Sequence, residues 1–315
     1  MEGFTRRAAW GGPLLVAIGA ALWGTDGILR VPLTRTMAAP AIVLDEHLLL
    51  ALYAIPALLL SRAALARLRP AQWVALVAIA WGGSGLATVL FTMAFATGNP
   101  TTVILLQKIQ PVFAVLLARL MLGEPLGRRY WPWFILAMLG AYLVSFESLA
   151  PFWELGRARV LTAVFALGAA ALWGSATVFG RFVLADLPFP TVTGARFLFA
   201  LPFLFLLALG QGQVGGALLG LQSTPLNLAA LALIPGLISL LLYYDGLTTT
   251  RASIATLAEL AFPATAVLLN WLFLHQGVTL TQLVGFALVW LTVAALDRLS
   301  TPTPAAGPVP LAGSA

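Results

Sequence analysis

The chain has 315 residues, of which 61% are hydrophobic and only 9% are charged, and its mean hydropathy is +0.97. A soluble domain carries about 25% charged residues, so this composition excludes a water-soluble fold and indicates an integral membrane protein. The net charge is +6, but the arginines lie mostly between apolar runs, where they set membrane orientation rather than bind nucleic acid. The absence of cysteine excludes disulfides and thiol chemistry.

Ten apolar runs follow one another along the chain, each long enough to cross a hydrocarbon core of about 30 Å as a helix. Lipid tolerates no unpaired backbone groups, and the runs show no two-residue alternation, so a β-barrel is excluded. We therefore predict an all-α integral membrane protein with ten transmembrane helices. In chain order, the predicted helices are residues 12–32, 39–61, 72–95, 99–122, 129–148, 158–184, 189–209, 226–248, 252–274 and 278–298. Residues 299–315, rich in Pro, Ala and Gly, are predicted to be a disordered tail.

Arginine in the connecting segments predicts a multi-pass protein of the inner (cytoplasmic) membrane with both termini in the cytoplasm. Ten arginines fall on the predicted inner side and four on the outer side. The inner ones are Arg6, Arg7, Arg62, Arg67, Arg69, Arg128, Arg129, Arg181, Arg251 and Arg298, and the outer ones are Arg30, Arg35, Arg157 and Arg159. The first apolar run is too long for a signal-peptide core, so it is expected to be a retained helix.

Two sequence patterns recur at nearly the same offset. Residues 21–25 read ALWGT and residues 171–175 read ALWGS, while residues 107–117 and 259–269 share a proline followed by an apolar run. Because each repeat contains an odd number of helices, the second copy enters the membrane from the opposite face. The pattern predicts two inverted five-helix repeats, a common plan of secondary transporters.

The order of these motifs resembles the EamA-domain branch of the drug/metabolite transporter superfamily. The resemblance covers residues 12–298, as a first repeat over 12–148 and a second over 158–298. It rests on the Trp-Gly pairs 23–24 and 173–174, on Pro111 and Pro263, on residues 122–125 (LGEP), on Gly140 and Gly285, and on Arg196-Phe197. The chain departs from the pattern where Gln276 replaces the counterpart of Glu124, and where Glu46 occupies the counterpart of Arg196.

The resemblance implies a ten-helix exporter or exchanger of amino acids or related small metabolites, working by alternating access between the repeats. It also implies a central cavity lined by predicted helices 1, 3, 4, 6, 8 and 9, with helices 5 and 10 at the periphery. A homodimer is a further possibility. No cofactor is expected.

Ionisable side chains inside the predicted helices cost roughly 2.5–3.5 kcal/mol each to insert and normally face a partner or a cavity. They are Asp26, Asp45, Glu46, His47, Lys108, Arg119, Arg196 and Glu259. Their depths predict two sets: an acid of the second helix with Lys108 near the outer face, and Arg196 with Glu259 near the inner face. Each set is either a gate or substrate anchor, or a structural ion pair that fixes helix register. A buried acid such as Glu259, Glu46 or Asp26 could also carry a coupling proton.

Aromatic residues at equivalent depths add to the candidate site. Trp23 and Trp173 lie near the middle of the membrane, away from the interfaces where Trp usually concentrates. Phe91 is the repeat equivalent of Tyr243, and Gln107 is the equivalent of Glu259. The candidate substrate-binding residues are therefore Trp23, Asp26, Glu46, Gln107, Lys108, Trp173, Arg196, Tyr243 and Glu259. Pro111 and Pro263 are expected to kink their helices, to free the carbonyls of Gln107 and Glu259, and to act as hinges.

Other functions are less well supported by the sequence. It contains no Walker A, H-E-x-x-H or G-x-S-x-G pattern, and its two histidines, His47 and His275, lie on different helices, so no ATP-driven, catalytic or metal site is expected. The leading hypothesis is a secondary transporter and not an enzyme. A non-transporting scaffold or receptor, and an intramembrane enzyme, stay open as alternatives.

Overall fold

The computed structural model describes residues 11–34, 36–97, 106–107, 109–124, 126–145, 157–274 and 279–299, and all regular structure within these ranges is helical. In the first half the helices are α1 (Gly12–Trp23), α2 (Asp26–Thr34), α3 (Ala39–Leu60), α4 (Arg62–Leu65), α5 (Pro70–Val77), η1 (Ala78–Leu86), α6 (Ala87–Thr97), α8 (Gln110–Leu122) and α9 (Tyr130–Ser145). In the second half they are α10 (Arg157–Val183), α11 (Phe189–Gly210), α12 (Val214–Ser223), α13 (Pro225–Leu231), η2 (Ala232–Ile238), α14 (Ser239–Thr249), α15 (Ala252–Ala258), α16 (Ala261–Leu274) and α17 (Leu280–Leu299).

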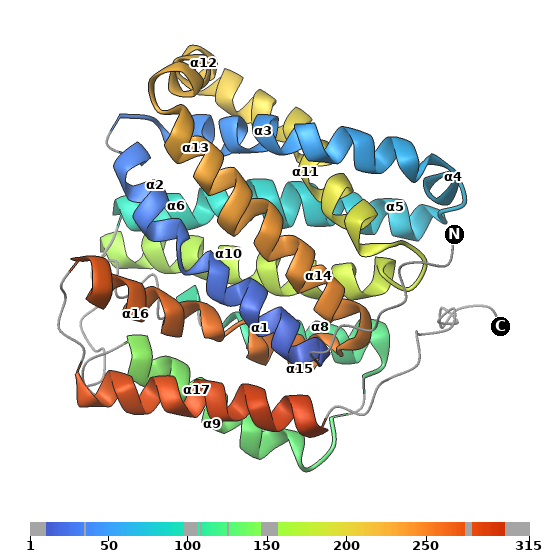
Figure 1. Ribbon diagram of the computed structural model, residues 1–315, viewed down its shortest axis with the longest axis vertical. Helices are drawn as coiled ribbons and strands as arrows, with labels where there is room; N and C mark the ends of the chain where they lie inside the picture. Colours follow the sequence, from blue (N-terminus) through green and yellow to red (C-terminus); the bar gives the residue numbers. More distant parts are fainter. Residues whose placement is uncertain are drawn as a thin grey trace.

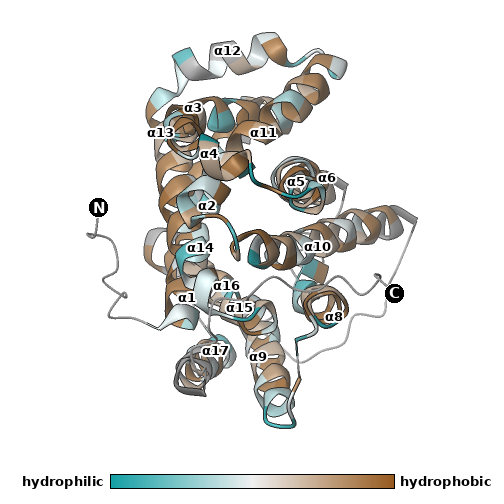
Figure 2. Cartoon of the chain, turned by 90° about the vertical axis from the view of Figure 1, so that its right-hand side faces the viewer, coloured by the Kyte–Doolittle hydropathy of each residue, from teal (hydrophilic) through white to brown (hydrophobic). Residues whose placement is uncertain are grey.

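The helices have the length and the surface of a membrane bundle. Six of the described helical stretches are long and apolar enough to span a bilayer, and four shorter apolar helices accompany them. Leucines on their outer faces are widely exposed, for example Leu52 at 77% and Leu60 at 89%. Such exposure suits lipid rather than water, and hydrophobic residues dominate the helices in Figure 2. The protein is therefore a multi-pass membrane protein, and the number of ten spanning helices stays a prediction.

The helices run roughly side by side between two ends of the bundle (Figure 1). We call them the α4 end, where α1 begins and α10 finishes, and the α12 end. Gly12 at the start of α1 packs on Gly246 near the end of α14. Arg181 near the end of α10 donates a hydrogen bond to the carbonyl of Thr248, which also lies near the end of α14. Because α1 leaves the α4 end and α10 arrives there, the first helices of the two halves run in opposite directions.

Equivalent helices of the two halves make equivalent contacts. The second helices, α3 and α11, pack on each other, and so do the last helices, α9 and α17, which lie together at one edge of the bundle (Figure 2). Gly140 of α9 approaches Gly285 of α17 so closely that an added Cβ would lie 3.1 Å from its carbonyl oxygen. This packing places α9 and α17 away from the centre, as the family resemblance implied.

Several stretches predicted as single helices are interrupted. The first predicted helix breaks at Gly24–Thr25 into α1 and α2, and the ninth breaks at Glu259–Leu260 into α15 and α16. The third and eighth predicted helices each contain a π-helical segment, η1 and η2. Such irregular backbone is tolerated in membranes where it is buried in protein, and π-segments are frequent at functional sites.

The positions of Pro111 and Pro263 contradict the prediction that each proline kinks a continuous helix. Pro111 lies in the first turn of α8 and Pro263 in the first turn of α16, where a missing N–H costs nothing, rather than inside a continuous helix. The carbonyl of Glu259 is not free either, because it accepts a hydrogen bond from the backbone N–H of Phe262 at 3.0 Å. The expected mid-helix kinks are therefore helix starts that follow a break.

Helix α12 was not predicted from the sequence. It connects α11 to α13 and lies across the ends of α3 and α11 (Figure 2). Beneath it Asp45 of α3 is fully buried, and neither carboxyl oxygen has a hydrogen-bond partner among the described residues. A Cβ added to Gly220 of α12 would lie 2.7 Å from one of these oxygens, so only a residue without a side chain allows α12 to pack this closely.

Candidate functional site

The repeated Trp-Gly pairs join the two halves of the bundle. An added Cβ on Gly24 of α1 would lie 2.9 Å from the backbone nitrogen of Ala266 in α16. An added Cβ on Gly174 of α10 would lie 3.0 Å from the nitrogen of Ala114 in α8. Each first helix therefore packs on the proline-containing helix of the other half, at a contact that only glycine permits.

The tryptophan of each pair contacts an aromatic ring on the equivalent neighbouring helix. The ring of Trp23 lies 5.2 Å from that of Tyr243 in α14, and the ring of Trp173 lies 5.0 Å from that of Phe91 in α6. The indole N–H of Trp173 also donates to the carbonyl of Gly83 in η1 at 2.9 Å. Two related aromatic pairs therefore flank the centre of the bundle.

Glu259 lies at the break between α15 and α16 and is enclosed by neutral donors. Its carboxylate accepts hydrogen bonds from Tyr243 (2.8 Å), Thr177 of α10 (2.9 Å) and Gln110 of α8 (2.5 Å). Gln107 donates to the side-chain oxygen of Gln110 at 2.9 Å. We call these five residues the Glu259 network. It joins both halves of the chain, and it satisfies a buried carboxylate without a cation.

Arg196 of α11 forms a separate cluster, which we call the Arg196 group together with Ser84 and Tyr244. Its Nε donates to the Ser84 hydroxyl at 2.7 Å, and Nη1 donates to the Tyr244 hydroxyl at 3.1 Å. The predicted ion pair between Arg196 and Glu259 is therefore wrong: each group has its own neutral partners. The rings of Tyr243 and Tyr244, 5.2 Å apart, lie between the two networks.

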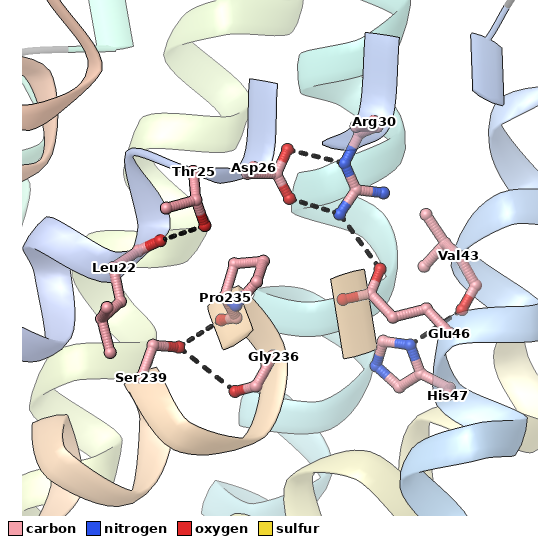
Figure 3. A network of polar contacts seen from close by, with 10 residues as sticks. All are labelled: Leu22, Thr25, Asp26, Arg30, Val43, Glu46, His47, Pro235, Gly236 and Ser239. Atoms are coloured by element: carbon pink, nitrogen blue, oxygen red, sulfur yellow. Dashed lines mark hydrogen bonds and ion pairs between the residues drawn. The ribbon is translucent and has the colours of Figure 1, made fainter. Parts of the chain in front are cut away.

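A third cluster, the Arg30 triad, joins α2 to α3 (Figure 3). It lies toward the α12 end of the bundle (Figure 1). Arg30 donates to both oxygens of Asp26, at 2.7 and 2.6 Å, and to Glu46 at 3.0 Å. The sequence pattern assigns Arg30 to an outer segment and does not predict this role. The signal was present, because Asp26 and Arg30 have the i,i+4 spacing of a helical ion pair.

The Gly-Glu motif after α8 fastens the two halves at the α4 end. Gly123 adopts a left-handed conformation with φ 62°, which turns the chain so that Glu124 reaches the start of α15. The Glu124 carboxylate accepts from the backbone N–H groups of Ala252 (2.7 Å) and Ser253 (3.0 Å) and from the Ser253 hydroxyl (2.6 Å). These are the orphan donors of a helix N-terminus. The counterpart Gln276 and the neighbouring His275 lie outside the described residues.

The structure thus brings together only part of the predicted site. Tyr243 contacts both Trp23 and Glu259, Gln107 joins Glu259 through Gln110, and Trp173 lies one helical turn from Thr177. Arg196 forms its own cluster, and Asp26 and Glu46 belong to the triad. Lys108 and residues 300–315 of the predicted tail fall outside the described residues, whereas Leu299, predicted to begin the tail, ends helix α17. Gln110 and Thr177 were missed, although Gln110 precedes the motif proline and Thr177 shares a helix face with Trp173.

The described residues contain no group of three or more His, Asp or Glu side chains that could hold a metal ion. The chemistry of the centre is therefore that of aromatic rings, hydroxyls, amides, one carboxylate and one guanidinium. Such a set can bind a small molecule through its ring and its polar edge, without covalent chemistry.

Residues 10–146 and residues 160–296 each match the family described as "EamA-like transporter family". A curated relative, "Riboflavin transporter ImpX" of Fusobacterium nucleatum subsp. nucleatum (strain ATCC 23726 / VPI 4351), is 32% identical over 297 residues, which are 92% of this chain and 98% of that protein. A solved crystal structure superposes with a TM-score of 0.71 at 18% identity, over 94% of this chain and 99% of that one. The last similarity concerns the fold alone.

Proposed function

Because the chain belongs to the EamA-like transporter family, we propose that it is a secondary transporter of a small planar metabolite with an aromatic or heteroaromatic ring, of the riboflavin kind. Members of this family are transporters and not enzymes, which agrees with the prediction from the sequence and removes the scaffold and enzyme alternatives. The substrate class and the direction of transport belong to the proposal.

The conjunction of rings and polar groups at the centre carries the proposal. Trp23 with Tyr243, and Trp173 with Phe91, offer aromatic faces from both halves. Gln107, Gln110 and Thr177 offer amides and hydroxyls of the kind that pair with the edge of a heteroaromatic ring. The similarity to a relative named as a riboflavin transporter points to the same class of ligand.

Amino acids are the second candidate, as the family resemblance implied. A specific observation favours them: Arg196 and Glu259 carry opposite charges but are paired with neutral groups instead of each other. A zwitterion could offer its carboxylate to one and its ammonium group to the other. Competition between labelled riboflavin and single amino acids separates the two candidates.

Alternating access would use the contacts between the halves. We propose that the α4 end faces the cytoplasm of an inner membrane, because the predicted arginine asymmetry favours it, and that transport runs outward. The break at Gly24–Thr25 packs on α16 beside Ala266, and the break at Glu259–Leu260 lies directly before α16. They and the first-turn prolines Pro111 and Pro263 are the proposed hinges.

Glu259 is the proposed carrier of a coupling proton. Its partners are all neutral, so protonation would not break an ion pair, and its position at a helix break allows the side chain to change partners. In the triad, protonation of Asp26 or Glu46 would disrupt a direct bond to Arg30.

Flux measurements in proteoliposomes test the proposal. Purified protein is reconstituted, and labelled riboflavin is followed in both directions, with and without a pH gradient, against empty liposomes. We expect saturable flux that a pH gradient of one sign accelerates and that Glu259→Gln uncouples from the gradient. Flux equal to that of empty liposomes for riboflavin and for all amino acids would contradict the proposed function.

A further inference from the structure

Arg196 has unused hydrogen-bonding capacity at the centre of the bundle. A guanidinium has five N–H donors. One on Nε reaches Ser84 and one on Nη1 reaches Tyr244, and the structure gives the other three no acceptor among the described residues. No described carboxylate lies within ion-pair distance of Arg196 either.

The side chain is nevertheless held firmly in place. Ser84 belongs to η1 and Tyr244 to α14, so two helices fix the guanidinium through neutral hydroxyl groups, without a direct ion pair. A cation inside a membrane bundle normally pairs with an acid or faces a polar ligand. The same chain gives another partly buried arginine, Arg30, two carboxylates as direct partners.

The free side of the guanidinium lies next to the proposed ring-binding residues. Nη2 lies 3.6 Å from the position that a Cβ on Gly83 would occupy. The carbonyl of the same glycine accepts the indole N–H of Trp173. Arg196 and Trp173 are therefore neighbours across Gly83, and a ligand whose ring contacts Trp173 could direct a charged substituent to Arg196.

We infer that Arg196 is an anion-binding subsite, and that the transported metabolite carries a carboxylate or a phosphate besides its planar ring. This inference rests on the proposed function and refines its substrate class. A planar guanidinium with two N–H groups on one nitrogen suits both oxyanions, since each can accept two parallel hydrogen bonds. Ser84 and Tyr244 are positioning residues that aim the guanidinium.

Two matched ligand pairs test the inference on the purified full-length protein. Riboflavin is compared with riboflavin 5′-phosphate, and tryptophan with tryptamine, so each pair differs in one anionic group. Flavin binding is followed by fluorescence quenching and indole binding by equilibrium dialysis. We expect the anionic member of one pair to bind at least about tenfold more tightly, in keeping with a charge-assisted hydrogen bond in a partly buried site. A preference in the flavin pair indicates a subsite for phosphate, and a preference in the indole pair indicates a subsite for carboxylate.

The variants locate the preference. Arg196→Gln is expected to remove it while binding of the neutral ligand changes by less than about twofold, and Arg196→Lys is expected to retain part of it. Arg181→Gln is the matched control, because Arg181 is a buried arginine that also bonds to a neutral partner, the carbonyl of Thr248. It should leave the preference unchanged.

The outcomes separate the two claims. Equal binding of charged and neutral ligands by the wild type, or a preference that survives in Arg196→Gln, overturns the anion subsite and leaves the proposed function intact. Failure of all four ligands to bind contradicts the proposed function itself. If Arg196→Gln does not fold, the wild-type comparison and Ser84→Ala, which should weaken the preference severalfold, still decide the matter.

Discussion

The Arg30 triad and the Glu259 network both satisfy buried acids, but by different means. In the triad one guanidinium contacts two carboxylates, Asp26 within α2 and Glu46 on the neighbouring helix α3 of the same half. In the network a carboxylate receives only neutral donors, and these come from both halves of the chain. The direct ion pair between Arg30 and Glu46 fixes α2 against α3. A neutral cage instead allows the charge of Glu259 to change while the helices around it stay connected, which is what a site that binds and releases a charged species requires.

The largest expected effect comes from removing the central charge. Glu259→Gln replaces an acceptor of three hydrogen bonds by a group that must direct an N–H at a donor, and an unsatisfied buried group costs about 1–3 kcal/mol. We expect riboflavin flux in proteoliposomes to fall at least about tenfold, the rate equivalent of 1.4 kcal/mol. Glu46→Gln is the control, since Arg30 keeps Asp26; it should stay within about threefold of wild type. Equal losses of flux in both variants would contradict the distinction between the Glu259 network and the Arg30 triad.

The triad should instead show its role in stability. Arg30→Met leaves Asp26 and Glu46 facing each other without a cation, and we expect a loss of about 1–3 kcal/mol, less than for a fully buried pair because Asp26 is partly exposed. Thermal unfolding in detergent measures it. The triple variant that also carries Asp26→Asn and Glu46→Gln should recover most of the loss. An Arg30→Met variant as stable as wild type would show that the triad does not contribute to stability.

Asp45 provides a third case, because it lies next to Glu46 on α3 but has neither a cation nor a neutral donor among the described residues. Asp45→Leu is nearly isosteric and removes a buried polar group that has no partner. We expect the variant to be more stable by about 1 kcal/mol, read as a higher unfolding temperature. Asp26→Leu, at an acid with a partner, should lower it. A drop for Asp45→Leu would reveal a partner that the static arrangement lacks.

The smallest expected effect belongs to one donor of the network. Tyr243→Phe keeps the ring against Trp23 but removes the hydroxyl that donates to Glu259, which should reduce flux by about threefold to tenfold, as for one hydrogen bond to a charged group. Tyr53→Phe is the matched control, because its hydroxyl donates to the Pro190 carbonyl at 3.2 Å, outside the network. Equal flux for Tyr243→Phe and wild type would contradict a role for this bond.

Much of the framework could be predicted from the sequence. The apolar runs placed the helices, and the repeated Trp-Gly motif indicated the family. The equivalence of Phe91 with Tyr243 anticipated the two aromatic pairs, because equivalent positions in two related halves meet equivalent neighbours. These features depend on spacing along a helix, which a sequence displays directly.

The polar contacts could not be predicted in the same way. The predicted depths of Arg196 and Glu259 in the membrane match. A matched depth does not determine the direction in which two side chains point, and each of these two groups bonds to neutral partners instead. Arg30 was missed because the helix break at Gly24–Thr25 was invisible, so α2 was not recognised as a separate helix. Helix α12, of 10 residues, is apolar but too short to span a bilayer, and the π-segments lie inside longer apolar runs, so hydropathy distinguishes neither.

The glycine contacts between the halves also constrain how the chain is made. Gly19 and Gly24 of α1 pack on Tyr243 of α14 and on Ala266 of α16. During synthesis α1 therefore enters the membrane long before its packing partners exist, and it has to stay there unpaired until nearly the whole chain has been inserted. Contacts so distant in sequence form slowly. The first half produced alone would lack the surfaces on which its own first helix rests, so the two halves made as separate chains would have to be synthesised together to assemble.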